Sequence, residues 1–130
     1  MTPEDEVRLR HMLDAAKKAL QYFKGESRQE IDSDEIRVLA VTRLIEVLGE
    51  AAKNVSEITR NRSPEIPWRE IAGTRDRLIH GYFNVDLDIL WQITTVDLPV
   101  LIEHLERLLQ SDFPLPDLAV WFINSLKYSR

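Results

Sequence analysis

The sequence predicts an all-α fold, a helical bundle of four to five helices. Three long stretches carry apolar residues at three- and four-residue intervals, which is the spacing of one helix face. No stretch alternates polar and apolar residues as a half-buried strand does. A chain of 130 residues can bury one hydrophobic core and has the usual size of one domain. We therefore expect a single domain over residues 1–130.

The first predicted helix runs from Pro3 to about Phe23. Thr2 can cap it, Pro3 suits its first position, and the three acids that follow favour the positive end of the helix dipole. Gly25 is expected to end it. Its apolar face consists of Leu9, Met12, Leu13, Ala16, Leu20 and Phe23.

A polar loop, residues 26–30, leads to the second helix, which is expected from Asp34 to about Thr59. Its first half is apolar on nearly every side, as in a central, buried helix. Glycine inside a helix costs about 1 kcal/mol relative to alanine, so Gly49 indicates close approach of another backbone. A stripe of alternating charge on this helix is typical of a solvated ion-pair face. Alternatively, two of its acids support the residues of a functional site. The stripe is Arg43, Glu46, Glu50 and Lys53, and the two acids are Glu46 and Glu50.

The second half of the chain predicts two further helices and a terminal extension. A loop at 61–67 precedes a short helix from Trp68 to about His80, which Gly81 should stop. The next helix spans about 86–108, and Pro99 must kink or split it because proline lacks the backbone donor. Residues 113–116 then link to a short apolar segment, residues 117–128, that contains Trp121. The three tryptophans, Trp68, Trp91 and Trp121, are most simply core or interface residues.

Composition narrows the function classes. With no cysteine, the chain has no disulfide, zinc knuckle or thiol nucleophile. The acidic start, Met1–Glu6, is unlike a signal peptide, and charges interrupt every apolar stretch before membrane-spanning length. We therefore expect a soluble cytosolic protein. A net charge of −5 weighs against broad, charge-driven nucleic-acid binding. Residues 60–77 hold five arginines and three acids, a local balance of 5 − 3 = +2.

The stretch from Arg75 to Tyr82 carries the candidate chemistry. On one helix, Arg75 would fall in the apolar face, four residues after Ile71, where a guanidinium must be paired or functional. Asp76 and His80 would meet at i,i+4 spacing, and a carboxylate beside an imidazole fixes its tautomer. Side chains five residues apart on a straight helix point about 140° apart around its axis. Arg75 and His80 would therefore point in different directions. Either the helix bends near Gly81 or a second copy of the chain completes the site.

The pattern Arg75-Asp76-x-x-x-His80-x-Tyr82 resembles the signature of HEPN-domain proteins, specifically the HepT-like branch. Flanking segments also resemble that branch, and the likeness covers roughly residues 6 to 110, leaving 111–130 as a C-terminal extension. These segments are residues 8–13, Ser33-Asp34, residues 44–52, Ile66-Pro67-Trp68 and residues 85–91.

The resemblance implies a ribonuclease toxin that dimerises, with two copies of the signature at a shared cleft. It also implies an MntA-like nucleotidyltransferase antitoxin that attaches AMP to Tyr82. Metal-independent RNA cleavage needs an acid, a base and positive charge on the phosphorane. His80 suits the proton transfers, Arg75 the phosphate contact, and Asp76 the orientation of His80. In this interpretation Arg69 and Arg77 assist binding of an RNA such as tRNA or mRNA.

Neither a metal site nor a cofactor is expected, because His11 and His104 lack carboxylates at ligand spacing. DNA and membranes are not expected partners.

Other interpretations stay open for each residue and for the whole chain. Arg75 can be a structural arginine that pairs with carbonyls, Glu46 or Glu50. His80 can be a cation at a helix C-terminus, and Tyr82 can be a packing residue. The chain can also be a non-catalytic subunit that binds nucleotide or steadies a nucleotidyltransferase. A helical dimer without any activity is the third class.

Overall fold

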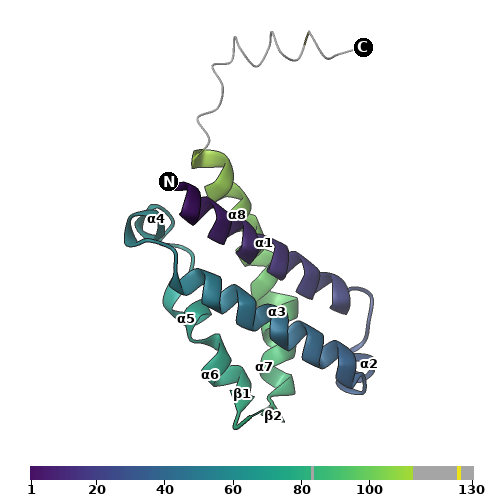
Figure 1. Ribbon diagram of the computed structural model, residues 1–130. Coiled ribbons are helices and arrows are strands. Elements are labelled where there is room, and N and C mark those ends of the chain that lie inside the picture. Colours follow the sequence, from purple (N-terminus) through teal and green to yellow (C-terminus); the bar gives the residue numbers. More distant parts are fainter. Residues whose placement is uncertain (83, 113–125, 127–130) are drawn as a thin grey trace.

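The computed structural model describes residues 1–82, 84–112 and 126 (Figure 1). Three long helices form the body: α1 (Pro3–Phe23), α3 (Glu35–Lys53) and α8 (Leu98–Asp112). Helix α1 packs against both α3 and α8. The predicted all-α class is therefore confirmed. The most deeply buried side chains of these helices are Leu9, Met12, Val41, Ile45, Leu98 and Leu105.

Helix α1 begins and ends as the sequence predicts. The Thr2 hydroxyl accepts a hydrogen bond from the Asp5 amide at 3.1 Å, and Gly25 adopts a φ of +79° just beyond the end. The expected polar loop after it is wrong in part, because residues Arg28–Asp32 form a short helix, α2. Ser27 and Glu30 cap its start reciprocally. Ile31, which is buried, anchors this turn to the core.

The single helix expected from Asp34 to Thr59 is two helices in the structure. Helix α3 ends at Lys53, and α4 spans Glu57–Arg62. The Asn54 side chain donates to the Glu50 carbonyl at 2.9 Å, which closes the end of α3. Ser56 then begins α4 as its N-cap. Local capping chemistry outweighs the continuous apolar pattern here.

A buried carboxylate on α1 holds the start of α4 in place. Asp5 is 1% exposed and accepts hydrogen bonds from the Ser56 amide at 3.0 Å and the Thr59 hydroxyl at 2.7 Å. The Ser56 hydroxyl also donates to it, and Arg8 lies 3.8 Å away. Burial alone would raise the pKa of Asp5, but these hydrogen bonds and Arg8 outweigh it and lower that pKa below its usual value.

Replacing Asp5 with alanine should lower the free energy of unfolding by about 2–4 kcal/mol at neutral pH, because it leaves buried donors unpaired. Since the folded-state pKa is lowered, the stabilisation is present above the unfolded-state pKa and is lost as pH falls through the folded-state pKa. The deficit of Asp5→Ala relative to the parent should therefore shrink in acid. Urea unfolding at neutral and acidic pH measures it.

The matched control for this prediction is Asp14→Ala, which removes an exposed carboxylate from the same helix. Its unfolding free energy should stay within about 0.5 kcal/mol of the parent. A deficit for Asp5→Ala no larger than that of Asp14→Ala would contradict the structural role of Asp5.

Gly49 is the point where α3 meets α5 (Trp68–Ala72), as the sequence predicts. A Cβ atom at Gly49 would lie 3.0 Å from the carbonyl oxygen of Ile71. The absence of a side chain thus lets the α5 backbone rest directly on the central helix. On α5, Trp68 is buried and its indole N–H donates to the Ser63 carbonyl at 3.0 Å. This contact fixes the segment that leads into the candidate site.

The helix expected from Trp68 to about His80 is interrupted at Gly73 and ends at Leu78. Gly73 separates α5 from α6 (Thr74–Leu78), and the chain then forms a two-stranded antiparallel hairpin. Its strands are β1 (Ile79–His80) and β2 (Asn84–Val85), with Ile79 opposite Val85. Two-residue strands are too short to show an alternating pattern in the sequence. The hairpin lies at the end of the bundle opposite α4 (Figure 1).

The last predicted helix is split, as Pro99 requires. Helix α7 (Leu87–Gln92) passes through a π-helical turn, η1 (Ile93–Asp97), into α8. The turn immediately precedes Pro99, whose missing N–H removes one helical hydrogen bond. Trp91 on α7 stacks on Phe23 with ring centroids 5.7 Å apart. The predicted segment 117–128 and Trp121 lie outside the described residues, apart from Leu126.

No helix in the described ranges is both long and apolar enough to cross a membrane.

Candidate active site

Arg75 lies on the surface of α6, although the sequence placed it in an apolar face. Its side chain is 53% exposed, and its Nε lies 3.5 Å from Oε2 of Glu46 on α3. The break at Gly73 causes the difference, because Thr74 takes the buried position and donates to the Glu70 carbonyl. Pairing with Glu46 was among the structural alternatives, and the structure shows that pair. The guanidinium is accessible to a ligand and also held by a carboxylate.

Glu46 is shared between two arginines. Its Oε2 lies 3.5 Å from Arg75 and 4.0 Å from Arg43, and its side chain is mostly buried. The charged stripe on α3 is thus partly solvated and partly attached to the candidate site. Because a mostly buried carboxylate pairs more strongly than an exposed one, Glu46 restricts where Arg75 can point.

His80 stands in the hairpin and not on the helix that carries Asp76. Helix α6 ends at Leu78, so the expected i,i+4 approach of Asp76 and His80 does not form. The carboxylate beside His80 comes from Asp86, with Nε2 to Oδ2 at 3.9 Å. His80 is 59% exposed, which leaves the imidazole open to solvent. Asp76 is itself exposed.

Asp86 is the residue that sequence reasoning missed. It was identified only as the start of the next helix, and it does cap α7, accepting from the Ile89 amide at 3.1 Å. Its own amide donates to the Leu78 carbonyl at 2.8 Å, across the base of the hairpin. Only a turn pattern that predicted a hairpin between His80 and Asp86 would have indicated that the two residues are neighbours.

Tyr82 is the most exposed of the large hydrophobic residues in the described chain, at 96%. It follows Gly81, whose φ of +73° belongs to the left-handed region that glycine adopts without strain. Helix α6 ends at Leu78, so Tyr82 lies beyond it, in the turn between β1 and β2. At this exposure the aromatic ring and hydroxyl of Tyr82 are accessible to solvent.

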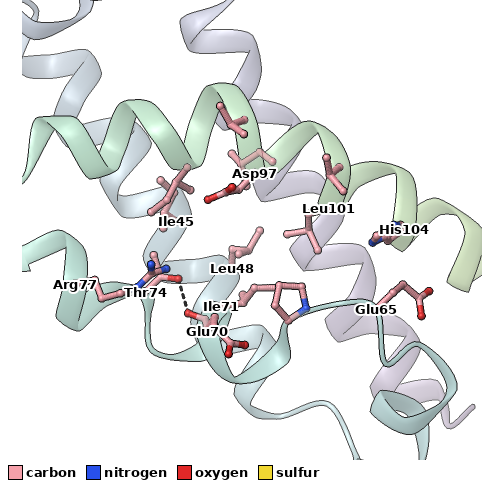
Figure 2. A pocket seen from close by; sticks show the side chains of 15 residues that line it. Ile45, Leu48, Glu65, Glu70, Ile71, Thr74, Arg77, Asp97, Leu101 and His104 are labelled. Carbon is pink, nitrogen blue, oxygen red and sulfur yellow. Dashed lines mark hydrogen bonds between the residues drawn. The ribbon is translucent and has the colours of Figure 1, made fainter.

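Arg69 and Arg77 are both exposed, on α5 and α6 respectively. Arg77 lines a groove of about 470 Å³ between α3, α5–α6 and η1–α8. Ile45, Leu48 and Leu101 form its apolar floor, and Figure 2 shows charged residues around them. The described residues that line the groove do not include Arg75, His80 or Tyr82. The groove is therefore a separate surface from the signature.

Among the described residues, no three histidine or acidic side chains gather closely enough to hold a metal ion. The groups that can act on a substrate at the hairpin end are thus a guanidinium, an imidazole and their two carboxylate neighbours. An exposed arginine suits a phosphate, and an exposed imidazole suits proton transfer near neutral pH.

Together, the fold and these residues define an all-α protein with an arginine–histidine signature at one end of its bundle. Comparison with protein families agrees with that class: a family model described as "Ribonuclease HepT-like" matches residues 12–108. The chain belongs to this HepT-like family, which is a family of ribonucleases.

Individual relatives extend the likeness over most of the chain. The chain is 35% identical over 104 residues to "Putative RNase TTE0752" of Caldanaerobacter subterraneus subsp. tengcongensis, covering 80% of this chain and 93% of the relative. It is 48% identical over 69 residues to "Probable ribonuclease HepT" of Thermococcus cleftensis, covering 53% of this chain and 63% of the relative. No solved structure matches the chain.

Proposed function

We propose that this protein is a cytoplasmic ribonuclease toxin that cleaves RNA without a metal ion, using Arg75 and His80. The observation that carries the proposal is the exposure of both side chains, Arg75 on α6 and His80 in the hairpin, each beside a carboxylate. Neither residue is needed to fill the core. Membership in the ribonuclease family supports the ribonuclease part of this proposal.

In the proposed reaction, His80 accepts the proton of a ribose 2′-hydroxyl as the 2′-oxygen attacks the neighbouring phosphorus. The bond from phosphorus to the 5′-oxygen then breaks, and an acid gives that oxygen a proton. The products are a 2′,3′-cyclic phosphate and a 5′-hydroxyl. Arg75 stabilises the added charge on the phosphorane by bidentate hydrogen bonds. Asp76 has no contact with His80, and so we assign it no orienting role.

A homodimer completes this mechanism. At its signature, one chain offers a single imidazole, that of His80. The base and the acid of a single turnover are best supplied by two imidazoles. The basic character of residues 60–77 is also slight in one chain, at 5 − 3 = +2, and a two-fold axis doubles it. Exposed Arg69 and Arg77 then add to the attraction of the RNA backbone.

The proposed regulator is an MntA-like nucleotidyltransferase antitoxin that attaches AMP to Tyr82. The exposure of this tyrosine supports the proposal, since a modifying enzyme must reach the hydroxyl. The phosphate of the adduct would lie near the signature, where it could pair with Arg75 in place of RNA. Modification would thereby block the substrate without unfolding the bundle.

Purified protein should cleave single-stranded RNA and leave 2′,3′-cyclic phosphate ends, at a rate that a chelator does not change. The reason is that the proposed acid, base and charge stabiliser are all side chains. Product ends are identified by mass spectrometry, and light scattering of the same sample should report a dimer at micromolar concentration.

Loss of cleavage on adding chelator would contradict the metal-independent mechanism, and a strictly monomeric active enzyme would contradict the shared site. Failure to cleave any RNA, combined with tight binding to a nucleotidyltransferase, would favour the non-catalytic subunit.

A further inference from the structure

The hairpin brings His80 and Asp86 together although they are six positions apart in the sequence. Strand β1 carries His80, and Asp86 directly follows β2. The hydrogen bond from the Asp86 amide to the Leu78 carbonyl, at 2.8 Å, closes the base of the hairpin. The Asp86 backbone is therefore fixed relative to the strand that holds the imidazole.

The two carboxylate oxygens of Asp86 have separate partners. Oδ1 accepts the Ile89 amide at 3.1 Å and so caps α7, while Oδ2 lies 3.9 Å from Nε2 of His80. The second distance exceeds that of a hydrogen bond, so the interaction is Coulombic. The cap restrains the carboxylate, and Nδ1 of the imidazole lies on the ring edge away from the nitrogen that Asp86 approaches.

Other charged residues near the hairpin are Arg75, Asp76 and Arg77 on α6 and Asp88 on α7. Of these four and Asp86, the structure brings only Asp86 within 4.0 Å of the imidazole as an ion-pair partner. Asp86 is therefore the carboxylate placed to orient the ring.

We propose that Asp86 is the positioning residue of His80: it orients the imidazole and stabilises the positive charge that His80 gains when it accepts the substrate proton. This inference rests on the proposed ribonuclease function for its kinetic consequence. The pairing itself does not depend on that function. It replaces Asp76, the carboxylate that the sequence pattern suggested, with one that lies outside the signature.

The test is Asp86→Asn, because asparagine caps a helix as well as aspartate but carries no charge. Its thermal unfolding should match the parent, while kcat falls about tenfold with little change in KM, as expected when a charge near 4 Å is removed at a partly exposed site. The control is Asp76→Asn, which should leave kcat unchanged.

A second readout separates this proposal from the proposed function. In NMR relaxation measurements, the His80 ring should be more mobile in Asp86→Asn than in the parent and unchanged in Asp76→Asn. If the parent does not cleave RNA but this difference appears, the pair stands and the ribonuclease mechanism fails. If Asp86→Asn leaves the mobility of the ring unchanged, or if Asp76→Asn raises it instead, the assignment of Asp86 is overturned.

Discussion

His80→Ala protein should lose RNA cleavage by a factor on the order of 10²–10⁴, the usual contribution of general acid–base catalysis. The effect should fall on kcat, and toxicity in growing cells should disappear with it. Because His80 is exposed and pairs with Asp86 alone among the described residues, the fold should persist. Single-turnover cleavage of a labelled RNA measures the rate, and circular dichroism checks the helical content.

The matched control is His11→Ala, which removes another exposed histidine from a helix distant in sequence from the signature. It should keep the parental rate. Arg75→Ala is a second test of the mechanism. Because Arg75 is exposed and not in the apolar face that the sequence predicts, its truncation should not disturb the core. A folded His80→Ala protein that cleaves RNA at the parental rate would refute the mechanism.

Tyr82→Phe should escape neutralisation completely while retaining RNA cleavage. The tyrosine oxygen is proposed to attack the α-phosphorus of ATP, losing its proton as pyrophosphate leaves, and phenylalanine has no such oxygen. Removing one exposed hydroxyl should not alter stability measurably. Intact mass after incubation with the cognate nucleotidyltransferase and ATP should show an AMP adduct on the parent and none on Tyr82→Phe.

Tyr22→Phe provides the control, since Tyr22 is 49% exposed and lies on α1, away from the signature. It should be modified as the parent is. An adduct that maps to Tyr22 or Tyr128, or no adduct on the parent, would rule out Tyr82 as the acceptor.

The parts of the fold that could be predicted from sequence are those set by periodicity and by local caps. The start of α1 at Pro3, the close approach at Gly49 and the interruption before Pro99 each follow from one residue's chemistry. The break after Lys53 was harder to predict, because the local caps there compete with a continuous apolar pattern. The carboxylate that holds Ser56, the cap of α4, belongs to Asp5, 51 positions before Ser56.

The candidate site shows the same limit more sharply. Family resemblance identified Arg75, His80 and Tyr82, but one helix from Trp68 to His80 would place Arg75 in an apolar face and His80 beside Asp76. The change of path at Gly73 exposes Arg75, and the turn at Gly81 exposes Tyr82. Asp86 became visible as a neighbour of His80 only once the hairpin was in place, because no helical or strand spacing connects the two positions.

The pair of Arg75 with Glu46 has a consequence for the choice of ligand. An incoming molecule does not meet a bare cation, because a carboxylate at 3.5 Å already compensates the guanidinium. It must therefore displace an existing charge–charge contact, and neutral ligands or single weak dipoles offer too little in exchange. A phosphodiester brings a full negative charge and two oxygens that match the guanidinium edge. Glu46 is therefore an internal competitor for any anion that approaches Arg75.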